Sequence, residues 1–324
     1  MVRTRSPEKT RRKAKTVSSL PDLRANERLF ADLHAAMREQ DFSSIEEAEE
    51  FFHTIIAGGG RPPRASKVTP LERAQDIMYN AWDASGEERI RLALKALALS
   101  KDCADAYVLL AGEVADEDEL AMRLLEDGVK AGERALGEQT FREEAGNFWM
   151  ILETRPYMRA RFGLALLLHS RGERRRAIGH FQDLLRLNPN DNQGARYELA
   201  TCLLEEGDDD ALERLLSRYD KDGSAVWLYS RALLKFRQEG ESQSAGASLM
   251  EAFGQNRYVP QYLLGKKRMP SRLPEYMSRG DRTEAVVYAH DNLNVWKDTP
   301  GALPWLDMTY RTFENSKAKG RRMR

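Results

Sequence analysis

The most constraining feature of the sequence is a repeat with a period of 34 residues. Residues 34 positions apart are of the same kind in three successive copies, at three apolar positions and one turn position. The four series are Ala177, Ala211 and Ala245; Phe181, Leu215 and Leu249; Ala165, Leu199 and Leu233; and Asn188, Asp222 and Asn256. A chain that repeats in this way folds as a stack of similar units, and each unit buries its apolar surface against its neighbours.

The repeated unit is predicted to be a helix, a turn and a second helix. From about residue 70 onward no segment alternates apolar and polar residues as a half-buried strand would. In the clearest copy, 158–191, Gly172 supplies the turn, Ala177 lets two helices approach closely and Pro189 follows the second helix. A 34-residue unit of this kind is typical of the tetratricopeptide repeat (TPR). We therefore predict an all-α fold, a TPR-like helical-hairpin solenoid with flexible basic termini.

Changes in composition along the chain predict its domain boundaries. The predicted segments are a disordered basic tail over 1–24, a small helical segment over 25–57, a Gly/Pro linker over 58–69, a TPR-like solenoid over 70–306 and a basic tail over 307–324. The clearest repeats are expected at 158–191, 192–225 and 226–259, with irregular helix pairs before them. Basic blocks without an apolar face cannot offset the entropy lost on ordering, so we expect residues 1–24 and 317–324 to be disordered. In the 25–57 segment, Leu29 and Phe30 begin the apolar stripe of the first helix.

The sequence offers no pattern for catalysis or metal binding. The five histidines never lie three or four residues apart and have no cysteine pair nearby. Cys103 and Cys202 lie far apart in Ala/Leu-rich surroundings, which is typical of buried thiols in a reducing compartment. The longest apolar run, 162–168, is far shorter than the roughly 20 residues that cross a bilayer. We therefore expect no catalytic, metal or cofactor site, and a cytoplasmic protein that is not held in a membrane.

The repeat does predict a binding surface. In stacked hairpins, positions 2, 5, 9 and 12 of each first helix share one face and line a concave groove. The candidate protein-binding residues at these positions are Arg159, Phe162, His169, Gln193, Arg196, Trp227 and Arg237. The three arginines would form a basic ladder for an acidic or C-terminal peptide, because a guanidinium binds a carboxylate through two hydrogen bonds. The alternative is that these arginines pair with neighbouring acids inside the solenoid.

Several further segments resemble the suppressor of tumorigenicity seven family. They are AYVLLA at 106–111, VKAGE at 129–133, NRYVPQYLL at 256–264, RGD at 279–281, EAVVYA at 284–289, WK at 296–297 and GAL at 301–303. Similar segments occur in that order in the family, and the resemblance covers roughly residues 70–306. It implies a helical, TPR-like fold and a regulatory or scaffold role without a catalytic motif. Animal members carry N-terminal membrane segments, which we do not expect here, because the stretches 155–161 and 188–194 resemble soluble, bacterial-type members.

The function predicted from the sequence is a non-enzymatic adaptor or scaffold that binds a protein or peptide through the concave groove. One alternative is a nucleic-acid-associated protein whose basic tails bind phosphate, and such binding would weaken steeply with salt. Another is a sensor that binds a small ligand in the groove. The sequence identifies neither the partner nor the oligomeric state.

Overall fold

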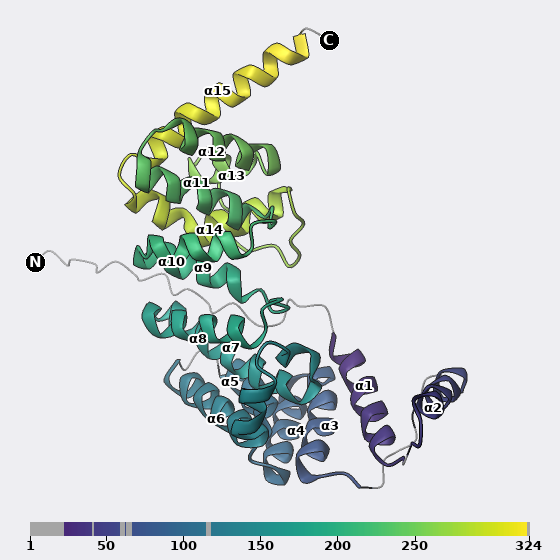
Figure 1. Cartoon of the computed structure of the whole chain (residues 1–324). Helices are drawn as coiled ribbons and strands as arrows, with labels where there is room; N and C mark the ends of the chain where they lie inside the picture. Colours follow the sequence, from purple (N-terminus) through teal and green to yellow (C-terminus); the bar gives the residue numbers. More distant parts are fainter. Residues whose placement is uncertain (1–22, 41, 59–61, 63–66, 115–117, 323–324) are drawn as a thin grey trace, which may run out of the picture. The chain divides into compact units, whose positions relative to one another are not determined.

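The computed structural model describes residues 23–40, 42–58, 62, 67–114 and 118–322, and all regular secondary structure in these ranges is helical (Figure 1). The chain divides into two compact units, Met1–Asn192 and Gln193–Arg324. We call them unit 1 and unit 2 and describe each by itself. Most of the predicted 1–24 tail and of the 58–69 linker lies outside the described residues.

Unit 1 consists of two leading helices and three helical hairpins. The leading helices are α1 (Leu23–Arg38) and α2 (Ile45–Ala57). The hairpins are α3 (Pro70–Asp83) with α4 (Gly86–Leu99), α5 (Ala104–Glu113) with α6 (Asp118–Glu143), and α7 (Arg155–Ser170) with α8 (Arg174–Leu187). Two short 3-10 helices, η2 (Phe148–Met150) and η3 (Leu152–Thr154), precede α7. The first helices of the hairpins contact one another in the order α3, α5, α7, and we call the surface they form the first-helix face of unit 1.

Local sequence signals explain where these hairpins begin and why they pack closely. At the start of α3, Thr69 and Glu72 form a reciprocal capping box, and Pro70 occupies the first turn, where no amide hydrogen is needed. Alanines dominate the contact between α3 and α4, where Ala74, Ala81 and others are fully buried. Small side chains let the two helix axes come close, as the helical-hairpin prediction requires.

Unit 2 continues the same pattern with two hairpins and a helical cap. The hairpins are α9 (Ala195–Glu206) with α10 (Asp209–Arg218), and α11 (Ala225–Glu239) with α12 (Gln243–Gln255). The short helix α13 (Val259–Leu263) and the long helices α14 (Arg282–Asp298) and α15 (Ala302–Arg322) follow. The first helices α9 and α11 contact each other, and α14 packs against both of them.

The structure confirms the all-α fold of TPR-like hairpins. Every residue of the three apolar 34-residue series is buried. The turn series also has a structural role, because Asn188 and Asn256 are the C-caps of α8 and α12. Asp222, the third member, accepts a hydrogen bond from the Ser224 amide in the turn before α11. The 34-residue period therefore marks equivalent positions in successive hairpins.

The predicted C-terminal boundary needs correction. The solenoid was expected to end at residue 306 and a basic tail to follow, with disorder over 317–324, but α15 continues to Arg322. Tyr310 and Phe313 are buried on this helix, with ring centroids 5.5 Å and 5.3 Å from that of Phe253. Leu306, Tyr310 and Phe313 have the i, i+4, i+7 spacing of one helix face. The basic composition of the last residues hid this apolar stripe.

Candidate protein-binding face

The residues predicted to line a groove fall into both units. Arg159, Phe162 and His169 lie on α7 of unit 1, whereas Gln193, Arg196, Trp227 and Arg237 belong to unit 2. A continuous ladder of arginines along both units therefore stays a prediction. Within each unit, the surroundings of these side chains are well defined.

Arg159 is the centre of a buried charge cluster. Its Nε and Nη2 atoms donate to the two carboxylate oxygens of Asp105 at 2.8 and 2.7 Å. Its Nη1 atom donates to both oxygens of Glu27 at 3.1 and 3.0 Å. Asp105 is 0% exposed and Glu27 is 3% exposed. One guanidinium therefore joins α1, α5 and α7.

Two further side chains complete this cluster. Arg155 donates from Nη1 to Glu27 at 3.2 Å, and its Nε atom donates to the Trp149 carbonyl at 2.9 Å. Gln75 of α3 donates to Asp105 at 2.7 Å. We call Glu27, Gln75, Asp105, Arg155 and Arg159 the Arg159 cluster. It links α1 to all three helices of the first-helix face of unit 1.

The electrostatics of the cluster fix the protonation states around it. Burial lowers the pKa of Arg159, but the nearby charges of Asp105 and Glu27 outweigh this effect and raise it above its ordinary value. Burial, together with the charge of Asp105, raises the pKa of Tyr79 and raises that of the Cys103 thiol to about 12. Arg159 thus stays charged, and Tyr79 and Cys103 stay neutral, near pH 7. These three groups suit binding or structural support better than proton transfer.

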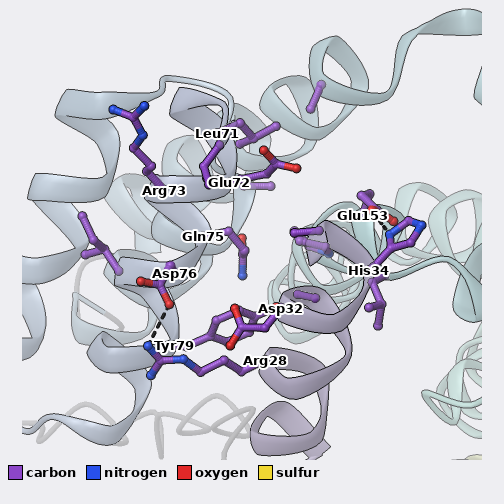
Figure 2. A pocket seen from close by; sticks show the side chains of 18 of the residues that line it. Arg28, Asp32, His34, Leu71, Glu72, Arg73, Gln75, Asp76, Tyr79 and Glu153 are labelled. Atoms are coloured by element: carbon purple, nitrogen blue, oxygen red, sulfur yellow. Dashed lines mark hydrogen bonds and ion pairs between the residues drawn. The ribbon is translucent and has the colours of Figure 1, made fainter. Parts of the chain in front are cut away.

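Helix α1 lies against the first-helix face through polar contacts along its length. Arg28 donates from Nη2 to Asp76 at 2.8 Å and from Nη1 to Asn80 at 2.9 Å, both on α3. At the other end of α1, Arg38 forms an ion pair with Glu72. Figure 2 shows Arg28 directed toward Asp76 and His34 toward Glu153 of η3, where the His34 Nδ1 atom lies 3.1 Å from Oε1.

A cavity of about 1340 Å³ lies beside these contacts (Figure 2). Side chains of α1 and α3 line much of it, including Asp32 of α1 and Leu71 of α3, and Gly132 of α6 also contributes. Leu29 and Phe30 on α1 are 43% and 52% exposed. Charged contacts therefore hold α1 near both of its ends, while two of its large apolar side chains stay partly exposed.

The other two predicted residues of unit 1 are less enclosed. Phe162 is half-buried, and its ring packs edge-on against Phe181 with centroids 5.9 Å apart. His169 is half-buried in the last turn of α7. Both side chains therefore keep part of their surface accessible in unit 1.

In unit 2, two of the predicted residues are part of one aromatic and ionic group. Trp227 is 0% exposed, its Nε1 atom donates to the Leu216 carbonyl, and its ring meets those of Tyr197 and Tyr219 edge-on. Arg196 donates from Nε to Asp222 at 3.0 Å and lies over the Tyr197 ring at 4.3 Å. Trp227 thus forms part of the core and does not line an open surface in this structure.

Arg237 and Gln193 complete the predicted set. Arg237 donates from Nη1 and Nη2 to the Leu204 carbonyl at 3.1 and 3.2 Å and from Nε to Thr299 at 3.2 Å. It also pairs with Asp209 at 3.1 Å. Arg237 thereby ties the end of α9 to the C-cap of α14, while Gln193 is half-buried. All three ladder arginines are paired with acids of the fold, which is the alternative that the sequence left open.

Sequence reasoning did not find the acids that pair with Arg159. Asp105 carried a usable signal, because it is the one charged residue in the otherwise apolar run CADAYVLLA at 103–111. An acid in such a run is expected to be buried and paired. Glu27 carried no such signal, since it follows a strongly basic segment and lies 132 residues from Arg159.

The comparison with known families decides the identity of this fold. The family described as "ST7 protein" matches residues 67–319. The chain belongs to the ST7 family. The match includes the helices α3 to α14 and most of α15.

Individual relatives agree with this assignment. A "Protein ST7 homolog" of Caenorhabditis elegans is 31% identical over 281 residues, which covers 74% of this chain and 51% of the relative. A human "Suppressor of tumorigenicity 7 protein-like" is 31% identical over 266 residues, covering 74% of this chain and 46% of the relative. The chain thus spans about half the length of these curated relatives. Among the helices in the described ranges, none combines the length and apolar character that a bilayer crossing requires.

One solved structure resembles the chain more distantly. The crystal structure of YrrB, titled a TPR protein with an unusual peptide-binding site, is 20% identical, with a TM-score of 0.41. The similarity covers 64% of this chain and 92% of YrrB.

Proposed function

We propose that this ST7-family chain is a non-enzymatic adaptor that binds a segment of another protein on the first helices of its hairpins. The observation that carries the proposal is the placement of α1. This helix lies against α3 and reaches the Arg159 cluster by ion pairs and hydrogen bonds, so the face already holds a helical segment. A surface that holds one helix through charged contacts has the chemistry to hold another.

Unit 2 supports the same use of first helices. Its long helix α14 packs on α9 and α11, with the Tyr288 ring 5.4 Å from that of Tyr229. Glu284 of α14, which is 3% exposed, accepts a hydrogen bond from the Ala225 amide at 2.8 Å. In both units, helices from outside the hairpins thus lie on first helices. We place the adaptor in the cytoplasm, because both cysteines are buried thiols that form no disulfide, as is usual in a reducing compartment.

Site-specific photocrosslinking in cells tests the proposal. A photoreactive phenylalanine analogue replaces Phe162 or His169, both half-buried on the first helix α7. The matched control carries the analogue at Arg186 on the second helix α8, whose side chain is 54% exposed. We expect the same protein to be crosslinked from the two α7 positions and not from the control. Equal capture from all three positions, or none from α7, would contradict the adaptor.

The cavity beside α1 favours one second candidate, a small-ligand sensor. Its volume of about 1340 Å³ leaves room for a small ligand, since ordinary ligand pockets measure roughly 300–1000 Å³. A thermal-shift screen of metabolites against the full chain separates the two functions. A saturable stabilisation that Gln75→Ala weakens would favour the sensor, because Gln75 lines the cavity.

A further inference from the structure

The contacts that hold α1 on unit 1 are charged, and they are spread along the helix. Glu27, near the N-terminal end of α1, enters the Arg159 cluster, and Arg28 pairs with Asp76. Arg38, eleven residues after Glu27, pairs with Glu72. In a helix that separation is about 16 Å, or three turns. The face is therefore complementary to a helix that carries an acidic side chain near its N-terminus and a basic side chain three turns later.

The apolar contacts of α1 are incomplete by comparison. Leu29 and Phe30 keep 43% and 52% of their surface exposed, and the cavity of about 1340 Å³ lies beside the helix. Burial of apolar surface is the main force that fixes a helix permanently, so a helix with an open apolar side is displaced more easily. A helix with larger apolar side chains could fill space that α1 leaves open.

The Arg159 cluster explains why an incoming helix would need a carboxylate. When Glu27 leaves, Arg159 keeps Asp105, but Arg155 loses its only ion-pair partner among the contacts described above. A buried or half-buried cation without a counter-charge is costly. A replacement helix that carries a carboxylate at this position restores the pair, and one that carries a neutral side chain does not.

We propose that α1 is a built-in occupant of the first-helix face of unit 1, and that it exchanges with an amphipathic helix of a partner protein. The partner helix carries a carboxylate that replaces Glu27 between Arg155 and Arg159, and a basic residue about three turns later that replaces Arg38. This inference rests on the proposed function. It adds that the free chain is closed by its own helix, so partner binding must first displace α1.

The test uses the full chain and a fluorescent peptide with the sequence of residues 23–38 as the probe. Two variants loosen α1 by different contacts: Glu27→Gln at the Arg159 cluster and Arg28→Glu opposite Asp76. The matched control for the first is Glu49→Gln, an exposed glutamate on α2. The control for the second is Arg28→Glu with Asp76→Arg, which restores an opposite-charge pair. Hydrogen exchange of residues 23–38 measures opening, and fluorescence anisotropy measures binding of the probe.

We expect faster exchange in α1 and at least about tenfold tighter probe binding in Glu27→Gln and Arg28→Glu than in the wild type and the two controls. Exchange in α3, α5 and α7 should stay as in the wild type. A probe in which the residue equivalent to Glu27 is glutamine should bind the opened chain at least about tenfold more weakly.

Three kinds of result would each overturn the proposal that a partner helix displaces α1. The probe could fail to bind although α1 opens, the glutamine probe could bind as well as the glutamate probe, or both variants could leave α1 closed or unfold the unit with it. Unfolding would show that α1 is an integral part of the unit. None of these results affects the crosslinking experiment at Phe162 and His169. A failure of the displacement proposal is therefore distinguishable from a failure of the proposed adaptor function.

Discussion

Removal of the Arg159 guanidinium should destabilise unit 1 far more than removal of an exposed arginine. In Arg159→Met, Asp105 keeps only the hydrogen bond from Gln75 among its side-chain partners described here, although it is 0% exposed. Breaking a buried ion pair by removing one partner costs about 3–5 kcal/mol. For a unit of this size, that loss lowers the melting temperature by roughly 6–20 °C.

Urea unfolding followed by circular dichroism, with hydrogen exchange to assign the transition to unit 1, measures this cost. The matched control is Arg186→Met on α8, whose side chain is 54% exposed and pairs with Asp183 on the same helix. It should change the free energy of unfolding by about 0.5 kcal/mol or less.

A double variant separates the cost of leaving a buried charge unpaired from the cost of changing the packing at the site. Arg159→Met with Asp105→Leu removes both charges, so it should be more stable than Arg159→Met alone. A loss of less than about 1 kcal/mol in the free energy of unfolding of Arg159→Met would refute the reasoning, because a loss of that size is expected for a solvent-exposed ion pair. A double variant less stable than the single one would refute it as well.

Three further predictions concern packing, pH and the C-terminal helix. Gly132→Ala would place a Cβ atom 2.7 Å from that of Tyr157, so it should cost about 1–3 kcal/mol in urea unfolding, whereas Gly112→Ala, with nothing within 4 Å, should be neutral or stabilising. Burial alone would raise the pKa of Asp222, but hydrogen bonds from the Ser224 and Tyr197 groups and from Arg196 hold it below its ordinary value. Its stabilisation is therefore complete above about pH 5 and is lost as the pH falls through the folded pKa. Asp222→Asn should therefore flatten the fall in melting temperature below about pH 5. Deletion of 307–324 removes two buried aromatic side chains and should destabilise unit 2 by about 3 kcal/mol or more, measured by the same urea assay; an unchanged stability would restore the boundary at 306.

The positions that the sequence predicted best are those that repeat. Ala177, Phe181 and their equivalents 34 and 68 residues later are all buried, because each hairpin makes the same contact between its own helices. Such contacts depend on nearby residues, and periodicity reports them directly. The family resemblance was also confirmed, since the family match over 67–319 includes the whole of the 70–306 segment that the resemblance covers.

The candidate binding residues were harder to place, because their partners come from distant parts of the chain. Arg159 sits at a groove position of its repeat, but its acid Glu27 lies 132 residues earlier, in a helix outside the repeats. Arg237 similarly meets Thr299, which is 62 residues later. Periodicity cannot show that a non-repeating helix covers a repeating surface.

Helix α1 also shows a limit of apolar patterns. Its stripe predicted that Leu29 and Phe30 pack inward, yet both are more than a third exposed, while the charged Glu27 is buried. The cost of burying a carboxylate is small enough when two arginines pair with it in good geometry. These arginines lie on α7, so no pattern within α1 could indicate them.

The most direct test of the account is hydrogen exchange of the full chain with and without the protein that is crosslinked from Phe162. If the first-helix face of unit 1 binds that protein in place of α1, residues 23–38 should exchange faster in the complex while α3 and α7 exchange more slowly. Unchanged exchange in all three helices, with the partner bound, would contradict the central claim.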